Sequence, residues 1–345
     1  MNRLFQYAAT AFITLFTGLM PLGGTAAAAD VSVAVSIIPQ KYLIEKIAGD
    51  TADVSVMVLP GASPATYEPR PAQLAALAGA DLYFSIGVPF ESAWLERILS
   101  ASKAMTPVAM DNGITKLPMA EHHHEDDRHA HEAHSHDEDG HHDHEEHGHH
   151  ETEHSDHAGI APHEHGHDEH GHDEHGHEHE GGSDPHVWLS PANMKVMART
   201  ATEALIRTAP QHAQLYRANL AAFEQEADAL DTRLRAIFAS TPSDRRAFMV
   251  FHPSWGYFAA DYGLHQIPIE LQGKEPSPRT LRELIETAQE KNIRVVFAAP
   301  QFSQKSAAVI ARSIGGTVVT ADPLAADWAD NLISVAEAFA ASFGN

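Results

Sequence analysis

The chain of 345 residues contains no cysteine. This absence excludes disulfide bonds, thiolate metal ligands and lipid attachment at an N-terminal cysteine. The fold must therefore be held together by burial of side chains alone. Roughly 250 residues remain when an N-terminal segment and a polar insert are set aside, which is enough chain for two domains.

Basic residues are scarce, since 23 Lys and Arg stand against 47 Asp and Glu for a net charge of −24. Most of this charge is local. Residues 121–180 hold 21 acidic residues against the single Arg128, so that segment carries −20 and the rest of the chain only −4. Without clustered Lys and Arg the sequence offers no surface for binding nucleic acid.

Long apolar runs are also missing, apart from Tyr7–Leu22 near the N-terminus. That run is short and interrupted for a membrane span, which needs about 20 apolar residues. It follows the basic Arg3 and precedes the small residues Gly23–Ala29. This pattern predicts a cleaved signal peptide over 1–29. We therefore expect a periplasmic protein that is soluble and monomeric once processed.

Short β-rich runs alternate with helical stretches on both sides of the polar insert. Strands are predicted at 31–38, 53–59 and 82–86, and again at 247–251, 294–298 and 317–320. Such alternation favours parallel sheets covered by helices. Two helical patterns, 191–208 and 211–239, lie between the halves, and the second could span about 40 Å.

The fold class predicted from this order is α/β, with two parallel-sheet lobes linked by a long helix and a metal site in the cleft between them. The predicted domains are an N-terminal lobe over 30–185, connecting helices over 186–240 and a C-terminal lobe over 241–345.

The insert, residues 120–183 of the first lobe, has a composition unlike the rest of the chain. Of 27 histidines, 23 lie between His122 and His179, interleaved with Asp, Glu and Gly. The segment has no apolar periodicity, which predicts disorder in the absence of ligand. Its imidazoles suit zinc, copper and nickel. The H-x-H pairs His163/His165 and His175/His177 are candidate auxiliary ligands.

Three residues outside the insert are stronger candidates. His186 follows the insert directly, while His252 and Asp322 each follow a predicted strand. Ligands of open α/β sheets bind at the carboxyl ends of strands. Two imidazoles and a carboxylate gathered there would suit zinc. Taken singly, each of the three also reads as an ordinary loop or turn residue. Glu270 and Glu275 are candidates for hydrogen-bonding the ligands.

The chain resembles the metal-capturing substrate-binding proteins of ABC importers, the ZnuA/TroA-like group. The resemblance extends over nearly the whole mature chain, in family order. Its motifs are Leu59-Pro-Gly-Ala-Ser-Pro, Tyr67-Glu-Pro, Ala80-Asp-Leu-Tyr-Phe-Ser-Ile-Gly, Asp184-Pro-His-Val-Trp-Leu-Ser-Pro, Phe251-His-Pro, Tyr262-Gly-Leu, Glu275-Pro-Ser-Pro, Pro300-Gln-Phe-Ser and Asp322-Pro-Leu. An acidic, His-rich insert before the Asp-Pro-His motif is typical of the zinc-specific members.

The resemblance implies metal ligands at His186, His252 and Asp322. It implies that the protein captures Zn(II) in the periplasm and delivers it to a membrane permease driven by an ATPase, without catalysis. Manganese members usually carry a carboxylate at the position of His252, so a histidine there favours zinc. Manganese remains the alternative cargo.

One position departs from the family pattern, because Ala65 stands where a ligand histidine is common. The fourth ligand must then be water, a carboxylate such as Glu68, or a histidine of the insert. An open position also leaves a zinc hydrolase as an alternative, although no H-E-x-x-H motif or nucleophile elbow is present. A periplasmic buffer for zinc, nickel or copper that acts through the insert is the third alternative.

Overall fold

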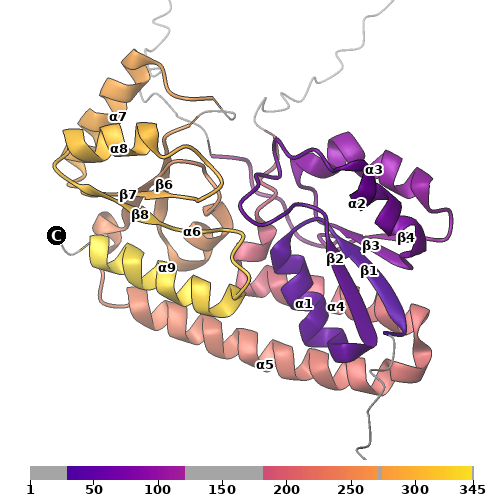
Figure 1. Ribbon diagram of the computed structural model, residues 1–345. Helices are drawn as coiled ribbons and strands as arrows, with labels where there is room; N and C mark the ends of the chain where they lie inside the picture. Colours follow the sequence, from indigo (N-terminus) through magenta and orange to yellow (C-terminus); the bar gives the residue numbers. More distant parts are fainter. Residues whose placement is uncertain (1–28, 121–181, 271–273, 344–345) are drawn as a thin grey trace, which may run out of the picture.

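The computed structural model describes residues 29–120, 182–270 and 274–343. Within these ranges the chain forms two α/β lobes that lie side by side, joined along one edge by a long helix (Figure 1). The predicted signal peptide and the His-rich insert lie almost wholly outside the described residues, so the predictions made for them stay predictions. No helix in the described ranges is long and apolar enough to cross a membrane.

The first lobe is built on a parallel sheet of order β2-β1-β3-β4. Its strands are β1 (Val31–Val35), β2 (Ala52–Val56), β3 (Leu82–Ser85) and β4 (Thr106–Ala109). Its helices are α1 (Ile38–Ala48), α2 (Pro71–Ala76) and α3 (Pro89–Ala101). Every residue of the inner strand β3 is buried, as expected for a parallel strand covered on both faces.

The second lobe repeats the pattern in a parallel sheet of order β6-β5-β7-β8. Its strands are β5 (Ala247–Val250), β6 (His265–Pro268), β7 (Val295–Ala298) and β8 (Thr317–Thr320). Its helices are α6 (Gly256–Tyr262), α7 (Pro278–Glu290), α8 (Lys305–Ser313) and α9 (Trp328–Ser342). The predicted α/β class with two parallel sheets is confirmed.

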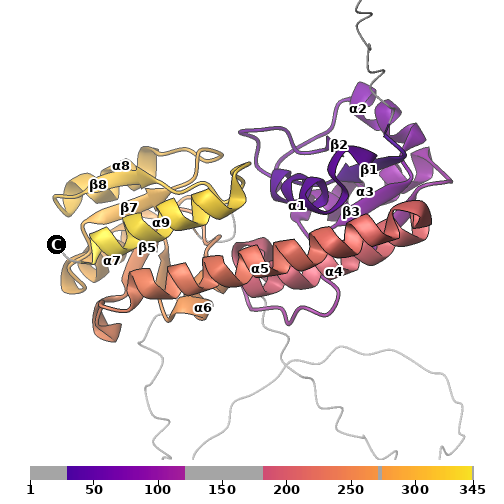
Figure 2. The same cartoon turned by 90° about the horizontal axis from the view of Figure 1, so that it is seen from below.

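Two helices connect the sheets. The first, α4 (Pro191–Thr208), begins at Ser190, whose side chain accepts a hydrogen bond from the backbone N–H of Asn193. The second, α5 (Ala213–Phe238), has 26 residues and is therefore about 39 Å long. It packs against α1 and α4 and against α9, and it runs along the bottom of both lobes in Figure 1 and across the front of both in Figure 2. The predicted linking helix is confirmed.

One cluster of buried apolar side chains continues from the first lobe into the second. It includes Val33 of β1, Leu234 and Phe238 of α5, and Phe339 of α9. The ring of Phe339 stacks on Phe248 of β5 with a centroid distance of 4.1 Å. A smaller cluster lies within the second lobe alone, between its sheet and the helices α7 and α8. The shared cluster ties the two lobes to the same helical support.

Strand order determines where a ligand can bind. In each sheet the chain leaves the second strand and crosses over to the opposite side of the first, so a switch point lies between β1 and β3 and another between β5 and β7. Ligands of open parallel sheets bind at the carboxyl ends of strands beside such points. His252 follows β5 and Gln301 follows β7, while the loop 86–88 follows β3.

Two strands, β4 and β6, are absent from the sequence-based prediction. The six predicted strands and the two predicted connecting helices lie where the sequence predicts them, although most are shorter by a few residues at their ends.

Candidate metal centre

His186 lies in a short loop between the end of the insert and α4. A turn of 3-10 helix, Val187–Leu189, follows it. The carboxylate of Asp184 accepts two hydrogen bonds from His186, one from the backbone N–H at 2.9 Å and one from the ring Nδ1–H at 2.7 Å. Both residues are buried. The local sequence Asp-Pro-His thus sets the orientation of its own imidazole.

His252 follows β5 and is oriented by a carboxylate that lies just beyond the neighbouring strand β6. Its Nδ1–H donates to Oε1 of Glu270 at 2.5 Å, and Glu270 is only 4% exposed. On one face the imidazole stacks on Phe302, with ring centroids 4.5 Å apart. Burial lowers the pKa of His252 below its ordinary value, and the nearby His186 lowers it further. The hydrogen bond to Glu270 raises the pKa, but this effect is smaller than that of burial. His252 is therefore neutral near pH 7, the form that binds a metal.

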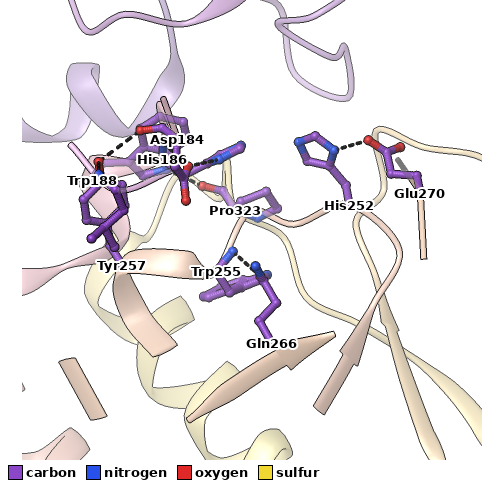
Figure 3. A network of polar contacts seen from close by, with 10 residues as sticks. Asp184, His186, Trp188, His252, Trp255, Tyr257, Gln266, Glu270 and Pro323 are labelled. Carbon is purple, nitrogen blue, oxygen red and sulfur yellow. Dashed lines mark hydrogen bonds and ion pairs between the residues drawn. The ribbon is translucent and has the colours of Figure 1, made fainter. Parts of the chain in front are cut away.

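The two imidazoles face each other across a gap, each with its carboxylate on the far side (Figure 3). Their ring centroids are 5.2 Å apart. Two rings bound through nitrogen to one tetrahedral zinc, with Zn–N near 2.0–2.1 Å, have centroids about 5 Å apart. Neither Nε2 atom has a hydrogen-bond partner among the described residues, and carboxylate-bound Nδ1 is the usual arrangement behind a metal-binding histidine.

Asp322 lies two residues beyond β8, and one of its oxygens is fully engaged. Oδ1 accepts hydrogen bonds from Nε2 of Gln301 at 2.7 Å and from the backbone N–H of Leu324 at 2.9 Å. Oδ2 has no partner in the described part of the chain. Each of the three residues predicted as ligands thus has one uncommitted donor atom.

The three side chains are not, however, gathered into one set. Within 29–120, 182–270 and 274–343, no three His, Cys, Asp or Glu residues form a group that could hold a metal ion. His186 and His252 line a common cavity of about 60 Å³. Asp322 does not line this cavity, although the two residues after it, Pro323 and Leu324, do. The residues that line it are Ser63, Pro64, Ala65, Val88, Pro89, Met119, Pro185, His186, Trp188, His252, Ser254, Gln301, Phe302, Pro323 and Leu324.

No candidate for the fourth ligand among the described residues lines the cavity. Ala65 is part of the cavity wall, so the position where a histidine is common does face the site. Glu68 is exposed and is not one of the lining residues. Glu275 is exposed as well. His163, His165, His175 and His177 fall outside the described residues.

The loop that carries His186 is attached to the second lobe at several points. The hydroxyl of Tyr257 in α6 donates to the carbonyl oxygen of Asp184 and accepts from the backbone N–H of Leu117, both at 3.0 Å. A Cβ at Gly256 would lie 2.4 Å from Oδ2 of Asp184, so only glycine permits this approach. The indole N–H of Trp188 donates to the carbonyl oxygen of Pro323 at 2.7 Å.

Sequence reasoning did not identify the part played by Asp184. The signal was available, since an Asp two residues before a His commonly accepts from that residue's backbone N–H. The pairing of Glu270 with His252, left open from the sequence, is present in the structure. Gln301 lies in the motif Pro300-Gln-Phe-Ser, but nothing in the sequence assigned a role to Gln301 or to Ser254, because a serine and a glutamine in loops are common.

Comparison with known proteins supplies the family. Residues 33–342 match the family described as the periplasmic component A of the zinc-uptake complex, ZnuA. The chain belongs to the ZnuA family. Members of this family are periplasmic metal-binding components of ABC uptake systems and act with a permease and an ATPase; they are substrate-binding proteins and not enzymes.

The relatives of this ZnuA-family chain include the high-affinity zinc uptake system protein ZnuA of Paracoccus denitrificans. The two are 36% identical over 270 residues, which cover 78% of this chain and 76% of the relative. A crystal structure of ZnuA matches with a TM-score of 0.72 and 39% identity, covering 91% of this chain and 99% of the other. The iron-binding protein YfeA of Yersinia pestis is 25% identical over 291 residues, covering 83% of this chain and 75% of that protein.

Proposed function

We propose that this protein captures Zn²⁺ between its two lobes and passes it to the permease of a zinc importer. The observation that carries the proposal is the pair His186 and His252. Their rings are 5.2 Å apart, and each is held through Nδ1 by a buried carboxylate. Zinc takes imidazole ligands readily, whereas manganese prefers oxygen donors. In this proposal Oδ2 of Asp322 is the third ligand.

The names of relatives differ in the metal they give, zinc for ZnuA and iron for YfeA. The donor set of this chain favours zinc over manganese, because two of its three candidate ligands are imidazoles.

Competition titration against a chromophoric chelator tests the proposal. The mature protein should take up one tightly held Zn²⁺, bind Mn²⁺ far more weakly, and lose the tight zinc in the variant His252→Ala. His265→Ala is the matched control, since His265 lies at the exposed start of β6 and should leave binding unchanged.

A second pair of samples separates capture from buffering. Deleting 120–182 should remove only weak, additional zinc equivalents and leave the tight one. If all zinc binding disappears with the insert, the protein is a buffer and the proposed function is wrong. Tighter binding of Mn²⁺ than of Zn²⁺ would reassign the cargo to manganese.

A further inference from the structure

Two buried oxygen atoms in the wall of the metal cavity have no hydrogen-bond partner among the described residues. They are Oγ of Ser254 and Oε1 of Gln301, and both residues line the cavity with His186 and His252. Ser254 is only 1% exposed. Leaving a buried polar atom unpaired is costly, and native proteins rarely do so without a reason.

The orientation of the Gln301 amide explains which of its atoms is left over. Its Nε2 donates to Oδ1 of Asp322 at 2.7 Å, so Oε1 remains as a free acceptor. Ser254 lies in a tight turn, with its backbone N–H donating to the carbonyl oxygen of His252 at 2.8 Å. Its hydroxyl can accept as well as donate. The loop that holds His252 and the loop after β7, whose Gln301 donates to Asp322, therefore each supply one unpaired acceptor.

Among the described residues, the proposed site has only three donor atoms for zinc. His186 and His252 line the cavity and Asp322 lies beside its lining residues Pro323 and Leu324, while the side chain of Ala65 offers no donor. Zinc in proteins takes four ligands. A volume of about 60 Å³ leaves room for a water molecule beside the ion, because water occupies about 30 Å³ in the liquid. A metal-bound water has two O–H groups and needs two acceptors.

We propose that Ser254 and Gln301 are positioning residues that hold a zinc-bound water in the place left by Ala65. The inference rests on the proposed zinc site and adds the identity of the fourth ligand. A zinc-bound water at this place donates one O–H to Ser254 Oγ and the other to Gln301 Oε1. In this proposal the water completes the set formed by His186, His252 and Asp322.

The variant Ser254→Ala tests this through two effects of opposite sign. Zinc affinity should fall about tenfold, the usual effect of losing one hydrogen bond to a charged or polarised group. The melting temperature of the zinc-free protein should stay the same or rise, because the unpaired hydroxyl is gone. Ser102→Ala is the matched control: Ser102 is a buried serine of the first lobe that donates to the carbonyl oxygen of Ala78. It should lower the melting temperature and leave zinc affinity unchanged.

A double-mutant cycle with Ala65→His locates the water. An imidazole at position 65 should displace the water, so Ser254→Ala should then cost less than twofold in zinc affinity. X-ray absorption of the full chain at one zinc equivalent should show two imidazoles with the remaining ligands oxygen, and three imidazoles in Ala65→His.

Three results would overturn the inference: unchanged zinc affinity in Ser254→Ala, an equal loss with and without His at position 65, or three imidazoles in the unmodified protein. The last would assign the fourth ligand to a histidine of the insert. Each differs from failure of the proposed function, in which the unmodified protein binds no tight zinc at all.

Discussion

Replacing Glu270 with glutamine should weaken zinc binding by about tenfold to hundredfold and leave the fold intact. Glu270 is 4% exposed and accepts the Nδ1–H of His252 at 2.5 Å. A neutral amide in its place makes the imidazole a weaker donor to the metal. Changes to such partners of metal-binding histidines cost 10–100-fold in affinity, which is about 1.4–2.7 kcal/mol.

The same substitution has a second, independent consequence. The bond to Glu270 raises the pKa of His252 against the larger effect of burial. Removing the negative charge should lower this pKa further, so protons should begin to compete with zinc at a lower pH in Glu270→Gln. General damage to the site would not produce weaker binding together with this shift.

Chelator competition measured at pH 7.5 and over a pH series checks both effects, with circular dichroism to follow the fold. Glu275→Gln is the matched control, since Glu275 is exposed and distant from the cavity lining. If Glu270→Gln binds zinc within twofold of Glu275→Gln, the carboxylate does not tune the ligand and the reasoning from geometry is wrong.

Two further predictions concern pH and stability. Because burial lowers the pKa of His252 below its ordinary value of 6.5, its contribution to the stability of the zinc-free protein is complete above pH 6.5 and is lost as the pH falls through the lowered value; urea unfolding in buffers of decreasing pH measures this loss. Protons also compete with zinc for His252 as the pH falls through the same lowered value, so its contribution to zinc affinity should decline there. Glu91→Gln should lower the free energy of unfolding by about 1–3 kcal/mol in urea titrations. The buried Glu91 carboxylate accepts from the hydroxyl of Ser36 and from the backbone N–H groups of Ile86 and Gly87, and an amide N–H₂ would face one of these donors. Stability equal to that of the unmodified protein would show that this network is dispensable.

All four inner strands were predicted from the sequence, whereas two of the four edge strands in the described sheets were not. Inner parallel strands such as β1 and β3 carry continuous apolar runs, which mark them in the sequence. The two strands that were not predicted, β4 and β6, are both edge strands and contain Pro107 and Pro268. Proline cannot donate to a ladder, so it is tolerated at edges and argues against a strand when only the sequence is known.

Missing β6 also concealed the best support for the metal site. In the parallel pairing of β5 with β6, Val250 lies opposite Pro268. Two residues beyond each of these are His252 and Glu270, so the register places the carboxylate beside the imidazole. No spacing in the sequence shows this, because it depends on a strand that only the fold reveals.

The residues chosen from the sequence and from the family resemblance were brought together only in part. His186 and His252 converge, while Asp322 stands behind the cavity wall and Glu68 is exposed. Their role as ligands stays a prediction. The resemblance specified which residue types to find at which motif, but the hydrogen bonds that leave one free atom on each of them are properties of the folded chain.

These bonds also bear on how the metal can enter and leave. Opening the lobes widely would break the bonds of Tyr257 to Leu117 and Asp184, the bond of Trp188 to Pro323, and the bond of the Trp328 indole N–H to the carbonyl oxygen of Trp188. Each buried group left unpaired costs about 1–3 kcal/mol, so a wide opening is far more costly than a local one. The cavity wall also includes Ser63–Ala65, from the loop between β2 and α2, and Val88–Pro89, where α3 begins. We therefore expect metal to exchange by displacement of the loop between β2 and α2, with His186 and His252 staying in place against their carboxylates.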